Sequence, residues 1–70
     1  MRIKIKSEVP LQLKKIELVV EVIPQTNAEL KSIINEEFIK NIALIISNMG
    51  YMVLEFVERQ GTDFTFIVQK

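Results

Sequence analysis

Two segments of this chain carry apolar side chains at positions that would face both sides of a strand. From Ile16 to Ile23, apolar residues fill every second position and two of the positions between them. The stretch from Tyr51 to Val57 repeats this arrangement. Successive side chains of a strand point to opposite faces, so both faces of a sheet built from these segments are apolar. A single helix covers one face only, and we therefore expect the other face to meet a partner.

The alternation along the rest of the chain predicts one α+β domain that spans residues 1–70. We expect strands at residues 2–6, 11–23, 51–58 and 64–69. The segment Ser7 to Pro10 separates the first two strands, and Lys14 and Lys15 shift the parity of the second, which indicates a bulge. Gly61 suits the turn before the last strand. The β-β-α-β-β order predicts a two-layer sandwich, with one long helix packed on an antiparallel or mixed four-stranded sheet.

The predicted helix lies between Thr26 and Gly50. Thr26 and Glu29 have the spacing of a capping box, and apolar residues then recur three and four positions apart. Gly50 suits the left-handed position that ends many helices. The pattern therefore predicts one helix of about 22 residues. Leu44 lies outside its main apolar arc, which makes this residue a candidate for a secondary interface.

The uncovered sheet face is the main candidate interface. The helix is expected to cover the face that holds Leu18, Val20, Val22, Met52, Leu54, Phe56, Phe64 and Phe66. The other face is then expected to hold Val19, Ile23, Tyr51, Val53, Val57 and Ile67. These residues predict a homo-oligomer, with a dimer favoured, or contact with another protein. The alternative is that β-branched residues are simply preferred in strands, and that neighbouring glutamates make the face tolerable in water.

Composition excludes most catalytic chemistry. The chain has no cysteine and no histidine, so it lacks a thiolate nucleophile and the commonest metal ligand and general base. Its two glycines are too far apart for a phosphate-binding loop. We therefore predict a nonenzymatic interaction module without a metal or cofactor. A less favoured alternative is a ligand site between subunits built from Glu17, Glu21, Glu55 and Tyr51.

The charges of the chain cancel in total but not along its length. Nine Lys and Arg balance nine Asp and Glu, whereas the segment through Lys15 carries five basic residues and one acidic residue. Arg2, Lys4 and Lys6 alternate on the first strand and could contact a nucleic-acid backbone, which is the alternative function. The longest apolar run is far shorter than the roughly 20 residues of a membrane span. We expect a cytoplasmic protein that does not enter a membrane.

One segment resembles part of a known family. Residues Leu54 to Gly61, which follow a capped helix, resemble the helix-to-hairpin portion of the dodecins, small flavin-binding assemblies. The resemblance covers about half of the chain. That family stacks its flavin on a tryptophan, and this sequence contains none, while its N-terminal strand is an addition to the pattern. No binding residue and no cofactor are therefore carried over.

Overall fold

The computed structural model describes all 70 residues as a four-stranded sheet with two helices, in the chain order β-β-α-α-β-β. The elements are β1 (Arg2–Pro10), β2 (Lys15–Ile23), α1 (Asn27–Ser32), α2 (Glu36–Asn48), β3 (Met52–Gln60) and β4 (Asp63–Gln69). Every pair of neighbouring strands is antiparallel, and the strand order is β1-β2-β4-β3. The α+β prediction and the antiparallel form of the sheet are confirmed.

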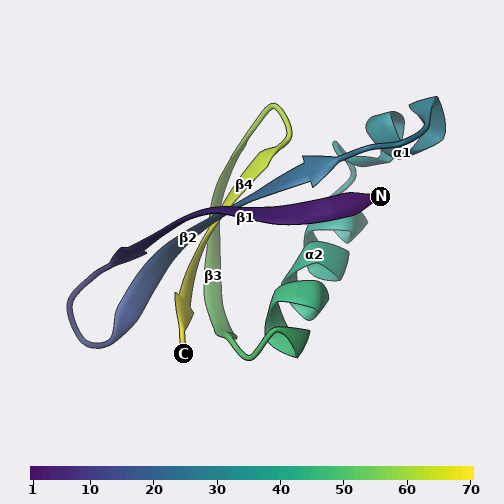
Figure 1. Cartoon of the computed structure of the whole chain (residues 1–70). Helices are drawn as coiled ribbons and strands as arrows, with labels where there is room; N and C mark the ends of the chain where they lie inside the picture. The colour runs from purple at the N-terminus through teal and green to yellow at the C-terminus, as the bar shows by residue number, and fades with distance from the viewer.

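Two hairpins, β1–β2 and β3–β4, meet along the pair β2 and β4 and leave β1 and β3 as the edges. Figure 1 shows both helices on the same side of the twisted sheet, with the β1–β2 turn projecting at the opposite end of the molecule. The chain is therefore elongated, with a longest extent of 39 Å against 17 Å in the other two directions.

The core lies between one face of the sheet and α2. We call this face the inner face and the opposite one the outer face. The fully buried sheet residues are Leu18, Val20, Val22, Phe64, Phe66 and Val68. Phe38, Ile42 and Ile46 of α2 are buried against them, at the spacing of three and four residues that one helix face requires. The two central strands thus follow the predicted alternation without interruption.

The prediction of one long helix is wrong, because the helical segment is interrupted at residues 33–35, between α1 and α2. The Asn35 side chain accepts a hydrogen bond from the backbone N–H of Glu37 at 3.0 Å, and the first turn of α2 carries Glu36 and Glu37. This is a second helix start, because the Asn35 oxygen accepts from an otherwise unpaired amide and the two acidic residues interact favourably with the positive end of the helix dipole. Gly50 has φ +101°, which confirms the predicted helix end.

The first hairpin also differs from its prediction. β1 continues through Ser7 to Pro10 because an edge strand tolerates a proline, whose missing N–H can face away from the ladder. The chain reverses in the next four residues, where Leu13 and Lys14 both have φ 62°. The change of parity at Lys14 and Lys15 therefore marks a turn between two strands and not a bulge within one strand. The bulge of this hairpin is at Lys6, the residue of β1 that has no partner on β2.

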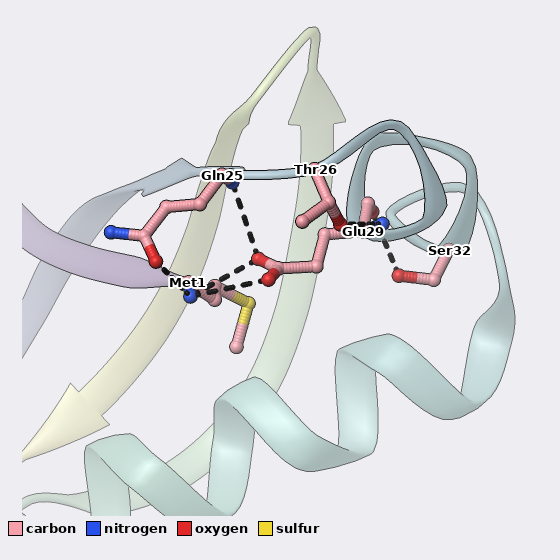
Figure 2. A network of polar contacts seen from close by, with 5 residues as sticks. All are labelled: Met1, Gln25, Thr26, Glu29 and Ser32. Carbon is pink, nitrogen blue, oxygen red and sulfur yellow. Dashed lines mark hydrogen bonds and ion pairs between the residues drawn. The ribbon is translucent and has the colours of Figure 1, made fainter.

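The cap of α1 joins this helix to the start of β1, as Figure 2 shows. Thr26 Oγ1 accepts from the N–H of Glu29 at 3.1 Å, which confirms the predicted cap. The Glu29 carboxylate accepts from the N–H of Gln25 and lies 3.1 Å from the amine of Met1. The hydrogen bond from this amine lowers the pKa of Glu29 below its usual value of 4.5. α1 itself has no buried residue, but its C-cap residue Ile33 is buried in the core. Polar contacts at the start of α1 and the burial of Ile33 at its end therefore hold this helix.

Candidate interaction surface

The outer face of the sheet carries five apolar side chains that no helix covers. Paired residues of neighbouring strands share a face, so the register assigns each side chain to one side. Val19 and Ile67 of the central strands lie on the outer face, and the pairing of the strands assigns the other outer-face positions from them. The apolar residues on this face are Val9, Val19, Ile23, Met52 and Ile67. Val19, Ile23 and Ile67 are half-buried by their strand neighbours, whereas Val9 and Met52 at the edges are exposed by 46% and 62%.

Of the six residues predicted for this face, two lie elsewhere and a third, Val57, is assigned to neither face by the register. Val53 is opposite the buried Val68 and packs against the core, so it belongs to the inner face. Tyr51 precedes β3 and is buried in the core. Val57 is in a bulge of β3 without a partner and is 48% exposed. Val19, Ile23 and Ile67 keep their predicted place on the outer face, and their role as an interface stays a prediction.

Two bulges in β3 explain these errors. Leu54 and Val57 have no partner on β4, and each extra residue reverses the parity of the strand after it. Residues three apart, Val53 and Phe56, consequently share the inner face, while Glu55 and Glu58 share the outer face. The same shift moves Met52 to the outer face, opposite Gln69, where alternation does not place it. The signal of this shift in the sequence is the spacing of Glu55 and Glu58, which are three residues apart and not two.

Tyr51 links the end of the helical segment to the first edge strand. The residue is 6% exposed, and its hydroxyl donates a hydrogen bond to the Glu8 carboxylate. The Lys70 ammonium lies 5.5 Å from the centre of the ring. Because the hydroxyl is used by Glu8 on β1, Tyr51 has a structural role and does not join the glutamates of the outer face.

The charges of the outer face are sorted by strand. The edge strand β1 contributes only basic residues, Arg2, Lys4 and Lys6, and the edge strand β3 contributes only acidic residues, Glu55 and Glu58. The central strands add Lys15, Glu17, Glu21 and Asp63. From β1 through β2 and β4 to β3, the net charges are therefore +3, −1, −1 and −2.

Two of the three basic residues proposed for nucleic-acid binding have acidic neighbours. Lys6 Nζ lies 2.6 Å from Asp63 Oδ2, and this hydrogen bond raises the pKa of Lys6 above its usual value of 10.5. Lys4 is opposite Glu21 on β2, whereas Arg2 is opposite the uncharged Ile23. These carboxylates would repel a phosphate backbone that approached along β1.

Neither edge of the sheet offers a long regular ladder to another strand. The bulge at Lys6 divides β1, and the bulges at Leu54 and Val57 divide β3 into shorter pieces. Bulges of this kind are a common protection against edge-to-edge pairing. A partner is therefore more readily accommodated on a face of the sheet than at an edge.

Within one chain, the residues of the candidate ligand site between subunits do not come together, and the site itself stays a prediction. Glu17 and Glu55 lie on either side of Ile67 on the outer face, two strand spacings apart, and Tyr51 is in the core. No three acidic side chains form a grouping able to hold a metal ion. Two surface depressions, of about 390 and 370 Å³, lie at the helical end of the molecule, and none of these residues lines them.

Leu44, the predicted secondary interface, is 63% exposed on α2. The residues three and four positions away on the helix are Lys40, Asn41, Ser47 and Asn48, and all are polar and exposed. Residues at these spacings are its neighbours on the helix surface. Leu44 is therefore a single apolar side chain in polar surroundings, whereas the outer face gathers several.

The chain matches no known protein family, no curated protein sequence and no solved structure. Neither of its helices has the length and apolar character needed to span a membrane. Any functional proposal for this protein therefore rests on its own residues.

Proposed function

We propose that this protein is a nonenzymatic protein-interaction module and that its binding surface is the outer face of the sheet. The observation that carries this proposal is the row of apolar residues on a face without a covering element, centred on Val19 and Ile67. Burial of each large apolar side chain contributes about 1.5 to 3 kcal/mol before the costs of association are deducted.

The surroundings of this apolar centre support a protein partner over a small ligand. The face is an open sheet surface, and the depressions of the molecule lie elsewhere. Its apolar residues alternate with charged and polar groups along β2 and β4, and a mixed surface of this kind is typical of protein interfaces, which as a whole are about as apolar as the rest of a protein surface. The divided edge strands remove the main competing mode, in which a partner adds a strand to the sheet.

Site-specific photo-crosslinking in cells that produce the full chain tests this proposal. A benzoylphenylalanine at Glu55, on the rim of the outer face, should give one discrete product whose partner is identified by mass spectrometry. The same group at Lys40, exposed on α2, is the matched control and should give none. Addition of Ile67→Lys should abolish the product from position 55. Absence of a product specific to position 55, or one that Ile67→Lys leaves unchanged, overturns the proposal.

A further inference from the structure

The turn between β1 and β2 carries the most exposed large apolar side chain of the molecule. Leu13 is 80% exposed, and Leu11 beside it is 42% exposed. We call residues 11–15 the hairpin tip. Figure 1 shows the tip projecting at the end of the sheet that lies away from both helices, and every residue from 8 to 15 is exposed. The tip is therefore accessible from all sides.

The backbone of the tip makes leucine an unexpected residue at position 13. Leu13 and Lys14 both have φ 62°, in the left-handed region that glycine, asparagine and aspartate adopt more readily than leucine does. Tight hairpin turns with two such residues favour the pair Asn-Gly. Leu13 thus favours the fold neither by its backbone preference nor by burial. A residue held in an unfavourable conformation indicates a role beyond the fold.

Three hydrogen bonds give the tip a defined shape. The N–H of Leu11 donates to the carbonyl of Lys15 at 2.7 Å, and the N–H of Lys15 donates to the carbonyl of Gln12 at 3.2 Å. The side-chain amide of Gln69 on β4 donates to the carbonyl of Leu13 at 3.2 Å. The two leucines are therefore presented by an ordered turn that is anchored to a central strand.

The tip is also basic. Lys14 and Lys15 follow Leu13 directly, and no acidic residue lies between positions 9 and 16, so this segment has a net charge of +2. Neither lysine makes an ion pair, because the two ion pairs of the molecule use Met1 and Lys6. Both ammonium groups are therefore available to an anionic surface.

We propose that the hairpin tip binds the surface of an anionic lipid bilayer. Leu11 and Leu13 enter the boundary between headgroups and acyl chains, and the two lysines contact the lipid phosphates. Apolar side chains beside basic ones are typical of segments that lie at such a surface. A narrow projecting tip offers little area to the surface of another protein, whereas lipid surrounds it on all sides.

This inference goes beyond the proposed function and does not depend on it. The expectation that the chain does not enter a membrane rests on the length of its apolar runs, and a tip that enters only the boundary needs no long run. The binding is weak and reversible, because even a single myristoyl chain gives only marginal attachment. Each lysine near an anionic surface contributes about fivefold to binding.

Sedimentation of the full chain with lipid vesicles tests the inference. The chain should bind vesicles of phosphatidylcholine that contain about 30% phosphatidylserine, and it should bind vesicles of phosphatidylcholine alone much less. Higher salt should reduce the binding, because the Debye length falls from about 10 Å at 0.1 M to about 3 Å at 1 M. Lys14→Gln should weaken the binding by about fivefold.

Leu13→Asn separates binding from folding. Asparagine adopts the left-handed region more readily than leucine, so the urea midpoint of the variant should rise. Its binding to the anionic vesicles should nevertheless fall by roughly tenfold or more, because one inserted leucine is lost. Leu44→Asn is the matched control, since it removes an exposed leucine from α2 and should leave vesicle binding unchanged.

A fluorophore reports which part of the molecule meets the lipid. The chain has no cysteine, so Gln12→Cys places a single environment-sensitive label on the tip. Its emission should shift to the blue when anionic vesicles are added. The same label at Lys40→Cys, which is exposed on α2, should show no shift.

Four outcomes overturn the inference. The first is a wild-type chain that does not sediment with anionic vesicles at low salt. The second is equal binding by Leu13→Asn, which would mean adsorption by charge without insertion. The third is equal binding to phosphatidylcholine alone, which would remove the lysines from the contact. The fourth is a benzoylphenylalanine at Gln12 that crosslinks to a protein while vesicles are not bound, which would assign the tip to a protein partner.

Discussion

The two faces of the sheet use apolar residues in different ways. On the inner face, six side chains of β2 and β4 are almost completely buried beneath α2. On the outer face, apolar residues of the same two strands alternate with charged and polar ones and are only half-buried. The inner face therefore accounts for the fold, whereas the outer face can remain in water and is free to meet a partner. Adjacent residues of one strand thus serve different purposes.

The largest expected difference between the faces is in the free energy of unfolding that is lost when Phe66 or Ile67, which are neighbours on β4, is replaced by alanine. Phe66→Ala should lower the free energy of unfolding by about 3 to 5 kcal/mol, because its ring is fully buried and packs 5.3 Å from the ring of Phe56. Ile67→Ala should cost about 1 kcal/mol in dilute protein. Urea unfolding followed by circular dichroism measures both. If Phe66→Ala does not fold, Phe66→Leu should give a smaller loss of the same origin.

Protein concentration sharpens this comparison. If the outer face binds a second copy of the chain, association stabilises the wild type by mass action, and the loss of unfolding free energy in Ile67→Ala should grow as the protein concentration rises. The loss of unfolding free energy in the Phe66 variants should not depend on protein concentration, because their outer face is intact. Equal losses at the two positions, independent of concentration, would contradict the assignment of different purposes to the faces.

A second prediction concerns Tyr51, which strand alternation places on the outer face and the structure places in the core. Tyr51→Phe should cost about 1 to 2 kcal/mol, because it removes the hydroxyl that donates to the Glu8 carboxylate. Thermal or urea unfolding measures the loss. In a Glu8→Gln background, the same substitution should cost clearly less, since the two changes remove one shared contact.

The solution mass provides the control for this residue. Tyr51→Phe should leave the solution mass of the chain unchanged at every protein concentration, because the buried ring does not reach the outer face. A Tyr51→Phe chain that keeps full stability but associates less would return Tyr51 to the interface, as alternation alone indicates.

Residue patterns predict this fold well where strands have neighbours on both sides. In β2 and β4, strict alternation identifies both faces, since each residue is paired and the parity never changes. The edge strands are harder, because a bulge needs no special residue: Lys6, Leu54 and Val57 are ordinary strand residues. One bulge is enough to move every later side chain to the other face. Tyr51 and Val53 of the predicted interface were therefore misplaced, Val57 is left without an assigned face, and Val9 and Met52 were not found.

The helix was misjudged for a different reason. The apolar spacing of three and four continues across residues 33 to 35, so periodicity alone predicts an unbroken helix. The interruption was encoded by Asn35 followed by two glutamates, a second start signal within the apolar pattern. Capping residues therefore need to be considered inside a periodic segment as well as at its ends. The charge sorting, in contrast, follows from strand order, which the linear sequence does not contain.

The smallest expected effect concerns the contact between Lys6 and Asp63, which joins the basic edge to a central strand across the outer face. The Asp63 carboxylate raises the pKa of Lys6 in the folded protein above the usual value of 10.5. A raised pKa of a basic group means that its contribution to stability is complete below that usual value and disappears as the pH rises through the folded value. Both side chains are solvent-exposed to a large degree, at 53% and 27%, so the contribution is small.

Comparison of the wild type with Asp63→Asn isolates this contact. The urea midpoint of the wild type should exceed that of the variant slightly at pH 8 to 9, and the difference should shrink as the pH rises above 10.5 through the raised pKa of Lys6 in the folded protein. The measurement is made in dilute protein, so that self-association does not contribute. A difference that does not shrink over this range would show that Asp63 stabilises the hairpin without the charge of Lys6. In that case the Lys6 ammonium is not held by Asp63, and its charge adds to the basic edge of the outer face.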